Sequence, residues 1–539
     1  MRKSRYTGFS LIVTPIVILA ALGIAECSSA PRGTPSASIA SATMPRIGSV
    51  DERFQSYNVE MVEITGGRFW KPYGEPVDAA LKSQSSAGEA GSNPVGMDPA
   101  LYQYRPPLDL SNPRLRKLAA ALGPAYMRVS GTWANTSYFQ DSDAPPPATP
   151  PKGFSAVLTR KEWKGVVDFA RAVDARIVTS FATSEGTRDA RGVWTSRQAR
   201  QLLAYTKSIG GSIAAAEFMN EPTYAAMGGA PKGYDAAAYG RDIAVFHRFI
   251  KQAAPDMIFL GPGSVGEGSS LPVSLGGGML KSEDLLAATG PVFDIFSYHF
   301  YGAASKRCAG MGAAAQTTAD AALSEEWLSR ADTVDAFYAG LRDRFEPGKA
   351  LWITEMADAA CGGNPWGSTF LDTFRYLDQH GSLAQRGVQV IAHNTLVSSD
   401  YGLLDENTLA PRPNYWAALL WRNLMGETVL NPGPSPAPVL HLYAQCLRGH
   451  PGGVALLAIN TDRTAAQELV VPVQSDRYTL MARSLQDTRI LLNGSELKLG
   501  ASDDLPPLSG LPAQPGRVTF APLSVTFLAI PNAGNSGCR

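Results

Sequence analysis

The sequence predicts an α/β fold, a (β/α)8 TIM barrel followed by a C-terminal β-sandwich domain. From about residue 55 to residue 425, short β-rich runs alternate with amphipathic helical segments, a pattern typical of βα units around a parallel sheet. There are about eight such repeats, which is the number a TIM barrel needs. After Trp421 the chain changes to short strand-like runs separated by Gly, Pro, Asn and Asp, which is typical of a sandwich.

Composition and charge support this fold class. The chain has 539 residues, 45% of them hydrophobic, which is enough for large cores and about two to four domains. Its 52 Gly and 39 Pro suit many loops on a rigid scaffold and argue against a helical bundle. Because 48 Lys and Arg balance 48 Asp and Glu, we expect no nucleic-acid partner, and any anionic ligand must be bound locally.

The first 25 residues are predicted to be a signal peptide. Basic residues Arg2, Lys3 and Arg5 precede an apolar stretch over residues 9–25, so we expect a secreted or periplasmic, cell-envelope protein. Cys27 offers an alternative as a lipidated residue, although Glu26 stands where a lipoprotein signal has a small residue. Membrane contact is therefore expected only through an N-terminal anchor or lipid.

Residues 26–50 are predicted to be a flexible linker, because the segment is rich in Ser, Pro, Ala and Thr. The catalytic barrel is assigned to residues 51–426. Its predicted strands are residues 57–63, 125–130, 176–181, 215–220, 257–261, 295–298, 350–354 and 388–394. Its clearest helices, with apolar residues three and four apart, are residues 163–173, 196–209, 235–253, 333–344 and 370–380.

The β-sandwich domain is assigned to residues 427–539. Its predicted strands are residues 439–446, 454–461, 468–473, 478–483, 491–492, 497–499 and 518–530. Besides Cys27 the chain has four cysteines, for which three pairings are conceivable. We favour Cys446–Cys538, which would fix the C-terminus to a strand, and Cys308–Cys361; four reduced buried thiols are the alternative.

Two carboxylates end strand-like runs of the barrel, where reacting groups of TIM barrels lie. Glu221 closes the fourth predicted strand within Asn220–Glu221–Pro222, and Glu355 follows the seventh. They should therefore face each other across the barrel mouth. Such a pair can cleave a glycosidic bond, one residue as proton donor and the other as nucleophile. Asn220 is placed to bond the sugar 2-hydroxyl.

Several segments resemble a heparanase-type member of glycosyl hydrolase family 79, and the resemblance extends over nearly the whole mature chain. These segments are LGPAYMRVSGT (122–132), FMNEP (218–222), SYHFY (297–301), WITE (352–355) with CGG (361–363), DYGLLDE (400–406), NYWAALLW (414–421), PPL (506–508) and SVTFLAIP (524–531). The resemblance implies a retaining enzyme with Glu221 as acid/base and Glu355 as nucleophile.

The resemblance also implies the substrate contacts. Tyr401 and the backbone amides of Gly362 and Gly363 match groups that hold the glucuronic acid carboxylate. Glu60 and Thr132 match positions that bond sugar hydroxyls, and Tyr301 matches one that supports the nucleophile. His299 and His393 lie near strand ends, where they would line the cleft. Their spacing gives no reason to expect a metal, and no cofactor is expected.

The implied substrate is a glucuronic acid-containing polysaccharide or glycoside. We expect a β-glucuronidase that cuts internally in heparan sulfate-like chains; an exo-β-glucuronidase on terminal glucuronides and a non-catalytic glycan-binding surface protein are the alternatives. The segment 261–268 carries Glu267 in place of basic residues, so no strong sulfate-binding cluster is expected there. Lys306, Arg307, Arg188 and Arg191 are interpreted as solvated loop residues, with some local positive charge at the cleft as the alternative.

Overall fold

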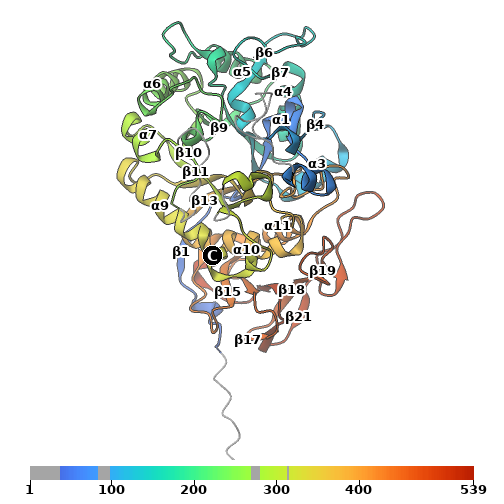
Figure 1. Cartoon of the computed structure of the whole chain (residues 1–539). Helices are drawn as coiled ribbons and strands as arrows, with labels where there is room; N and C mark the ends of the chain where they lie inside the picture. Colours follow the sequence, from blue (N-terminus) through green and yellow to red (C-terminus); the bar gives the residue numbers. More distant parts are fainter. Residues whose placement is uncertain (1–36, 83–97, 269–278, 312–314) are drawn as a thin grey trace, which may run out of the picture. The chain divides into compact units, whose positions relative to one another are not determined.

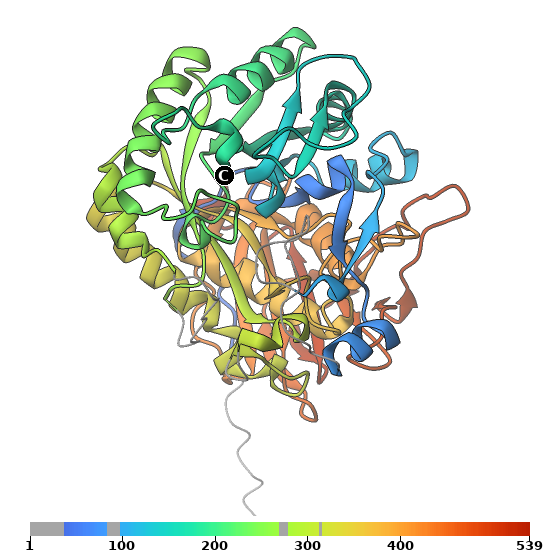
Figure 2. The same cartoon turned by 45° about the horizontal axis from the view of Figure 1, so that its top comes forward.

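Eight parallel strands form a closed barrel, as the sequence predicts (Figures 1 and 2). In chain order they are β2 (Gln55–Glu60), β5 (Ala125–Ser130), β8 (Ala175–Ser180), β9 (Ile213–Glu217), β10 (Ile258–Ser264), β11 (Ile295–Ala304), β12 (Leu351–Ala360) and β13 (Val388–His393). The computed structural model describes residues 37–82, 98–268, 279–311 and 315–539. The predicted signal peptide, Cys27 and residues 26–36 lie outside the described residues.

Amphipathic helices cover the barrel, and α6, α7 and α9 run along its outer side in Figure 1. The main helices are α3 (Pro113–Leu122), α4 (Arg160–Ala172), α5 (Arg197–Ser208), α6 (Ala236–Ala253), α7 (Ser282–Thr289), α9 (Arg330–Phe345), α10 (Phe370–Gln385) and α11 (Pro413–Leu424). Helix α4 shows why they form: Thr159 and Glu162 make a capping box, and Trp163, Val166 and Val167 bury one face.

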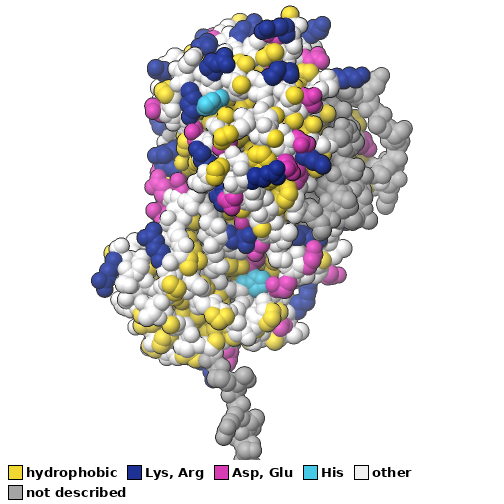
Figure 3. Space-filling view, turned by 90° about the vertical axis from the view of Figure 1, so that its left-hand side faces the viewer, with side chains coloured by type: hydrophobic (Ala, Val, Ile, Leu, Met, Phe, Trp, Pro, Cys, Tyr) yellow, Lys and Arg dark blue, Asp and Glu magenta, His cyan; other side chains and the backbone are white. Residues whose placement is uncertain are grey.

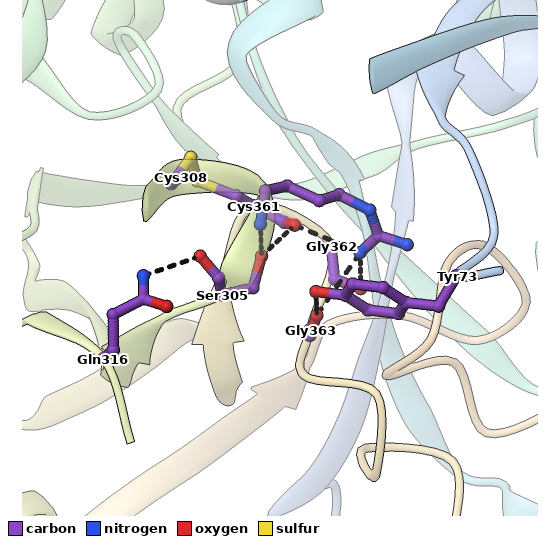
Figure 4. Close-up of a disulfide and its surroundings, with 8 residues drawn as sticks. Tyr73, Ser305, Cys308, Gln316, Cys361, Gly362 and Gly363 are labelled. Carbon is purple, nitrogen blue, oxygen red and sulfur yellow. Dashed lines mark hydrogen bonds between the residues drawn. A yellow bond between two sulfur atoms is a disulfide. The ribbon is translucent and has the colours of Figure 1, made fainter. Parts of the chain in front are cut away.

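Strands β11 and β12 continue well past the ends predicted at residues 298 and 354. They stay paired from Phe296↔Leu351 to Ala304↔Ala360, so Glu355 lies within a strand and not at its end. The extension stops where the Cys308–Cys361 disulfide joins the two segments, close to Gly362 and Gly363 (Figure 4). This double-stranded extension forms part of the rim at the carboxyl end of the barrel.

The chain between β2 and β5 adds further structure to that rim. Strand β2 ends at Glu60, three residues before the predicted end, because α1 (Met61–Thr65) begins there and Glu60 N–H donates to Glu63 Oε2 at 2.7 Å. A hairpin of β3 (Gly67–Trp70) and β4 (Tyr102–Arg105) and helix α2 (Glu75–Lys82) follow. Hairpin residues share an apolar cluster with Ala304 and Cys308, so the insertion packs on β11.

The C-terminal part is a two-layer antiparallel structure, as the predicted sandwich requires. One sheet has the order β1-β14-β15-β16-β23-β18-β19-β20, with β21 paired to β18, and β17 and β22 form a second small sheet. The strands are β1 (Arg46–Ser49), β14 (Met425–Leu430), β15 (Leu440–Leu447), β16 (Val454–Asn460), β17 (Gln467–Val471), β18 (Ser475–Met481), β19 (Leu491–Leu492), β20 (Ser495–Glu496), β21 (Leu511–Ala513), β22 (Gly516–Phe520) and β23 (Ser524–Ile530).

Strand β16 shows how this sheet is covered on both faces. Leu456 and Ala458 share a cluster with residues of β17 and β22. Leu457 and Ile459 point the other way and belong to the core that includes α10 and α11. A strand buried on both faces reads as a continuous apolar run, and β16 does so.

The prediction that residues 26–50 form a flexible linker is wrong for residues 37–50. Strand β1 pairs with β14 as an edge of the large sheet, and Ile39 and Met44 are buried against it. Strand β1 is short and polar and is held by backbone pairing, so no hydrophobic pattern in the sequence predicts it. The boundary between residues 51–426 and 427–539 stays a prediction, because residues 37–539 form one compact unit.

Both favoured disulfides are confirmed: Cys308–Cys361 and Cys446–Cys538. The second joins β15 to the last turn of the chain, Ser536–Cys538. Among the described residues, no helix combines the length and apolarity needed to cross a bilayer. On the face shown in Figure 3, basic and acidic side chains are interspersed, in keeping with the balanced charge.

Candidate active site

Glu221 lies in a tight turn directly beyond the fourth barrel strand, β9. Its backbone is left-handed, with φ 50° and ψ 64°, before the turn Pro222–Tyr224. A non-glycine residue in this conformation costs free energy and needs support from its surroundings. Asn135 gives that support: its side chain accepts from Asn220 N–H at 2.8 Å and donates to the Asn220 carbonyl at 2.9 Å.

Glu355, on the seventh strand, faces Glu221 as predicted. One carboxylate oxygen of each residue lies within 4.8 Å of the other, and His299 lies between them. Both carboxylates are largely buried, with side-chain exposures of 12% for Glu221 and 7% for Glu355. A pair this close can act on the two sides of one glycosidic bond.

Arg128, on β5, is the buried cation that organises the pair. Its guanidinium donates to Glu355 Oε2 at 2.9 Å, to Glu217 Oε2 at 2.8 Å and to Asn220 Oδ1 at 2.8 Å. Burial by itself would raise the pKa of Glu217, but the charge of Arg128 and a hydrogen bond from Thr354 lower it below its ordinary value. Arg128 therefore binds the carboxylates of Glu217 and Glu355, and it fixes the positions of Glu355 and Asn220 relative to each other.

His299, on β11, belongs to the same hydrogen-bond network, in which it acts as a donor to Glu221. Burial lowers the pKa of His299 to about 4, so the ring is neutral at pH 7. Because arginine only donates, the contact of 3.2 Å between Arg128 Nη2 and His299 Nε2 makes Nε2 the acceptor. The ring proton then sits on Nδ1, which lies 3.2 Å from Glu221 Oε1 and 3.6 Å from Glu355 Oε2.

This tautomer also bears on metal binding. Glu221, His299 and Glu355 form the one group of described residues whose ligand atoms could converge on an ion. A metal on His299 Nδ1 would need that nitrogen deprotonated, which places the proton on Nε2 against the Arg128 donors. The group is better explained as a hydrogen-bonded part of the carboxylate pair, and no residue is assigned to a metal.

The two glutamates have different environments. Burial raises the pKa of Glu221 to about 7, with Glu217 adding to the rise and Arg128 opposing it. Glu355 instead accepts a charge-assisted bond from Arg128 and a bond of 2.5 Å from the Tyr301 hydroxyl. The two carboxyls thus differ in their surroundings: burial raises the pKa of Glu221, whereas Glu355 has two strong hydrogen-bond donors.

Asn394 gathers three other predicted residues beside Glu355. Its Nδ2 lies 3.2 Å from Glu60 Oε1, 3.0 Å from Tyr301 Oη and 3.1 Å from Tyr401 Oη. Glu60 Oε2 is buried without a hydrogen-bond partner among the described residues. Burial, the nearby Glu355 and Glu63 raise the pKa of Glu60 well above its usual range.

The structure places Thr132 close to Glu60. A Cβ on Gly131 would lie 1.6 Å from Glu60 Oε2, so only glycine leaves room for that carboxylate. Thr132 follows directly and begins the turn Thr132–Thr136. His393, by contrast, points into the core: it is buried, and its Nε2 contacts the Tyr401 carbonyl at 2.8 Å. His393 therefore does not line the cleft.

The predicted role of the glycine pair needs a correction. Gly363 N–H donates to the Ala359 carbonyl at 3.2 Å, so it is already used within the protein. Gly362 and Tyr401 stay predicted carboxylate-binding groups. Arg307 is buried, and the Arg188 side chain is only 5% exposed, so neither is solvated as expected; their carboxylate partners are Asp400 and Asp242 respectively.

The sequence prediction missed Arg128, Glu217, Asn135 and Asn394. Arg128 and Glu217 stand in otherwise apolar strands, and a charged residue inside a barrel strand must find an opposite charge. The sequence therefore contains a signal for Arg128 and Glu217. Asn135 and Asn394 lie in or next to loops with no pattern around them, so their partners become visible only in three dimensions.

The chain is similar to known glycoside hydrolases. The family model "Glycosyl hydrolase family 79, N-terminal domain" matches residues 106–381. Mouse heparanase is 28% identical, covering 80% of this chain and 88% of its own. Heparanase-like protein 1 of Arabidopsis thaliana is 27% identical, with coverages of 80% and 86%. Hyaluronoglucuronidase of the leech Hirudo nipponia is 26% identical, with coverages of 80% and 92%.

Solved structures share the fold at low identity. A 4-O-α-L-rhamnosyl-β-D-glucuronidase from Fusarium oxysporum superposes with a TM-score of 0.57 at 12% identity, covering 92% of this chain and 99% of its own. A family 51 arabinofuranosidase from Xanthomonas axonopodis gives 0.58 at 16% identity, with coverages of 90% and 97%. These likenesses establish the barrel with its C-terminal sheet region.

Proposed function

The chain belongs to glycosyl hydrolase family 79, and from this premise we propose that it is a retaining β-glucuronidase of heparanase type. That the protein is a glycoside hydrolase follows from the family and its heparanase relatives. The observation that carries the proposal is the pair Glu221 and Glu355, whose carboxylate oxygens lie within 4.8 Å in different electrostatic environments. Retaining glycosidases place their two carboxyl groups about 5–5.5 Å apart.

In the proposed reaction Glu355 attacks the anomeric carbon while Glu221 protonates the leaving oxygen. The glycosidic bond breaks and a covalent glycosyl-enzyme ester forms on Glu355. Glu221, now ionised, then takes a proton from water as that water displaces Glu355. Arg128 and Tyr301 stabilise the Glu355 carboxylate before attack and after release. Asn220, held by Arg128 and Asn135, is placed to bond the sugar 2-hydroxyl.

We propose glucuronic acid as the sugar at the cleaved bond, held through its carboxylate by Tyr401 and the Gly362 amide. Relatives named heparanase and hyaluronoglucuronidase support a uronic acid-containing polysaccharide as substrate. Internal cleavage of heparan sulfate-like chains is the favoured mode. Exo-action on terminal glucuronides is the second candidate, because a raised rim can close one end of the substrate groove. The β3–β4 insertion builds up the rim beside Gly363, where Tyr73 Oη donates to the Gly363 carbonyl at 2.9 Å.

The substrate proposal is tested by incubating the protein with heparan sulfate, unsulfated heparosan and an aryl β-glucuronide in parallel. Shortened oligosaccharides indicate endo-action, and free glucuronic acid alone indicates exo-action. Proton NMR of the first product should show the β-anomer. An α-anomer as first product would contradict the retaining mechanism, and no turnover of any of the three substrates would favour a non-catalytic glycan-binding protein.

We also propose that the protein is exported, secreted or held in the periplasm or cell envelope. The basic and apolar character of residues 1–25 supports this, as do two disulfides, which persist in oxidising compartments. Fractionation of the producing cell tests this: recovery of the protein in the cytoplasmic fraction with residues 1–25 intact would contradict it.

A further inference from the structure

Arg307 is a buried cation at the rim, and it takes no part in the proposed reaction. It is 3% exposed and lies in the turn directly before Cys308. Its Nη1 lies within hydrogen-bond distance of three consecutive carbonyls, at 3.3 Å from Cys361, 3.0 Å from Gly362 and 3.3 Å from Gly363. Cys361, Gly362 and Gly363 all have positive φ, between 64° and 83°, so their carbonyls converge on one side of the turn.

Fixing these carbonyls also fixes the amides. In a planar trans peptide the N–H points opposite to the C=O of the same unit. The amides of Gly363 and Asn364 find acceptors on the far side, the Ala359 carbonyl at 3.2 Å and Asp358 Oδ2 at 2.9 Å. The Gly362 N–H points the same way, away from Arg307. Among the described residues it has no acceptor, which leaves it available to a ligand.

Other contacts hold the turn in the same state. The Tyr73 ring lies 3.9 Å from the Arg307 guanidinium, and its hydroxyl donates to the Gly363 carbonyl (Figure 4). Ser305 Oγ donates to the Cys361 carbonyl at 2.8 Å. Of the three consecutive residues with positive φ, only Cys361 is not a glycine and is strained, and Arg307 is the group that touches all three carbonyls.

Arg307 also reaches the second predicted carboxylate-binding group. It forms an ion pair with Asp400, the residue before Tyr401. Asp400 N–H in turn donates to the Gly362 carbonyl at 3.1 Å. The turn packs on Tyr401 itself, since a Cβ on Gly363 would lie 3.1 Å from the Tyr401 ring. One guanidinium therefore connects the glycine turn to the loop that carries Tyr401.

We propose that Arg307 is a positioning residue that holds the Gly362 amide and the Tyr401 hydroxyl in place for a substrate carboxylate, and so determines the preference for a uronic acid over a neutral sugar. This inference rests on the proposed function. Because Asp400 offsets the charge of Arg307, the selectivity comes from the placement of donors. An N–H held in a buried site binds a carboxylate more strongly than a neutral hydroxyl.

The test compares kcat/KM for an aryl β-glucuronide and the matching aryl β-glucoside in wild type, Arg307→Lys and Arg307→Gln. The ratio of the two values does not depend on the folded fraction of a variant. We expect it to fall about 10- to 100-fold, the range for a lost bond to a charged group, mainly through a higher KM for the glucuronide. Lys306→Gln, which removes the charge of the exposed neighbouring residue, should leave the ratio unchanged.

Tyr73→Phe is a milder variant, which tests the inference even if the Arg307 variants misfold. It removes one hydrogen bond to the turn and keeps the ring over Arg307, so we expect the ratio to fall about 2- to 10-fold. An unchanged ratio in the Arg307 variants and in Tyr73→Phe would overturn the inference while the proposed function stands. A wild-type protein that turns over neither substrate would refute the proposed function itself.

Discussion

Glu221 is the residue whose protonation state should control the rate of the proposed reaction. Burial raises its pKa to about 7, so the proton that the leaving oxygen needs is present below pH 7 and is lost as the pH rises through 7. We therefore expect kcat/KM for a β-glucuronide to fall about tenfold per pH unit above this point. A pH–rate profile of the wild type and of Glu221→Gln measures it. With an activated aryl glucuronide, the variant should lack this limb, and an identical limb in the variant would assign it to another group.

His299 offers a matched pair of variants for the same profile. Its Nδ1–H donates to Glu221 Oε1, which stabilises the ionised form. Asparagine keeps a donor near the Nδ1 position, whereas glutamine places its amide near Nε2. We expect His299→Gln to move the basic limb to higher pH, because the carboxylate loses a donor, and His299→Asn to leave it close to wild type. Equal shifts in both variants would contradict the assigned tautomer.

Single residues also show where sequence reasoning stops. The Asn220–Glu221–Pro222 motif and a second glutamate three βα units later were sufficient to predict the pair. Arg128 and Glu217 were detectable as charges in apolar strands. Arg307 was not, because a basic residue in a loop is usually solvated, and its partners come from segments around residues 71, 361–363 and 400.

Among the elements, strand β15 of the C-terminal sheet is tied to barrel helices by a charged contact. His441 on β15 pairs with Asp378 of α10 and with Glu325 of α8 (Glu325–Leu328), at 2.9 Å for Glu325. Tyr443 Oη also donates to Asp378 Oδ1 at 2.7 Å. Burial alone would lower the pKa of His441, but Asp378 and Glu325 raise it to about 9. The imidazolium is thus the bound form at neutral pH.

We expect His441→Gln to lower the free energy of unfolding by about 3 kcal/mol at pH 6. A histidine with a raised folded-state pKa contributes its full stabilisation below pH 6.5, and this is lost as the pH rises through 9. The stability difference between wild type and variant should therefore shrink between pH 7 and pH 10 in denaturant titrations. His450→Gln, at an exposed histidine, is the control. A difference that is the same at pH 6 and pH 10 would contradict the ion pair.

Element boundaries were predicted less well than the elements themselves. Periodicity locates each barrel strand, but it does not reveal that β11 and β12 continue to Ala304 and Ala360. Their extension is stabilised by mutual pairing and by the Cys308–Cys361 disulfide, which are contacts between remote segments. Strand β1 was missed for a related reason, since Arg46–Ser49 has no apolar alternation and forms only against β14.

For the molecule as a whole, the architecture follows from sequence pattern because it depends on repeated periods. Eight alternating units close a barrel, and the antiparallel sheet is recognisable from its short strands and turns. The site depends instead on single side chains brought together from β5, β9, β11 and β12. The order of the strands then decides the chemistry, since the fourth and seventh are separated by two strands in the closed barrel and direct Glu221 and Glu355 toward one sugar.

The most direct test of the proposed retaining mechanism is to trap the covalent intermediate with an activated 2-deoxy-2-fluoro-β-glucuronide and locate the label by peptide mass spectrometry. If Glu355 is the nucleophile, the protein should carry one sugar on the peptide that contains Glu355, and Glu355→Ala at equal folded fraction should carry no label. A label on another carboxylate, or undiminished turnover in Glu355→Ala, would contradict it.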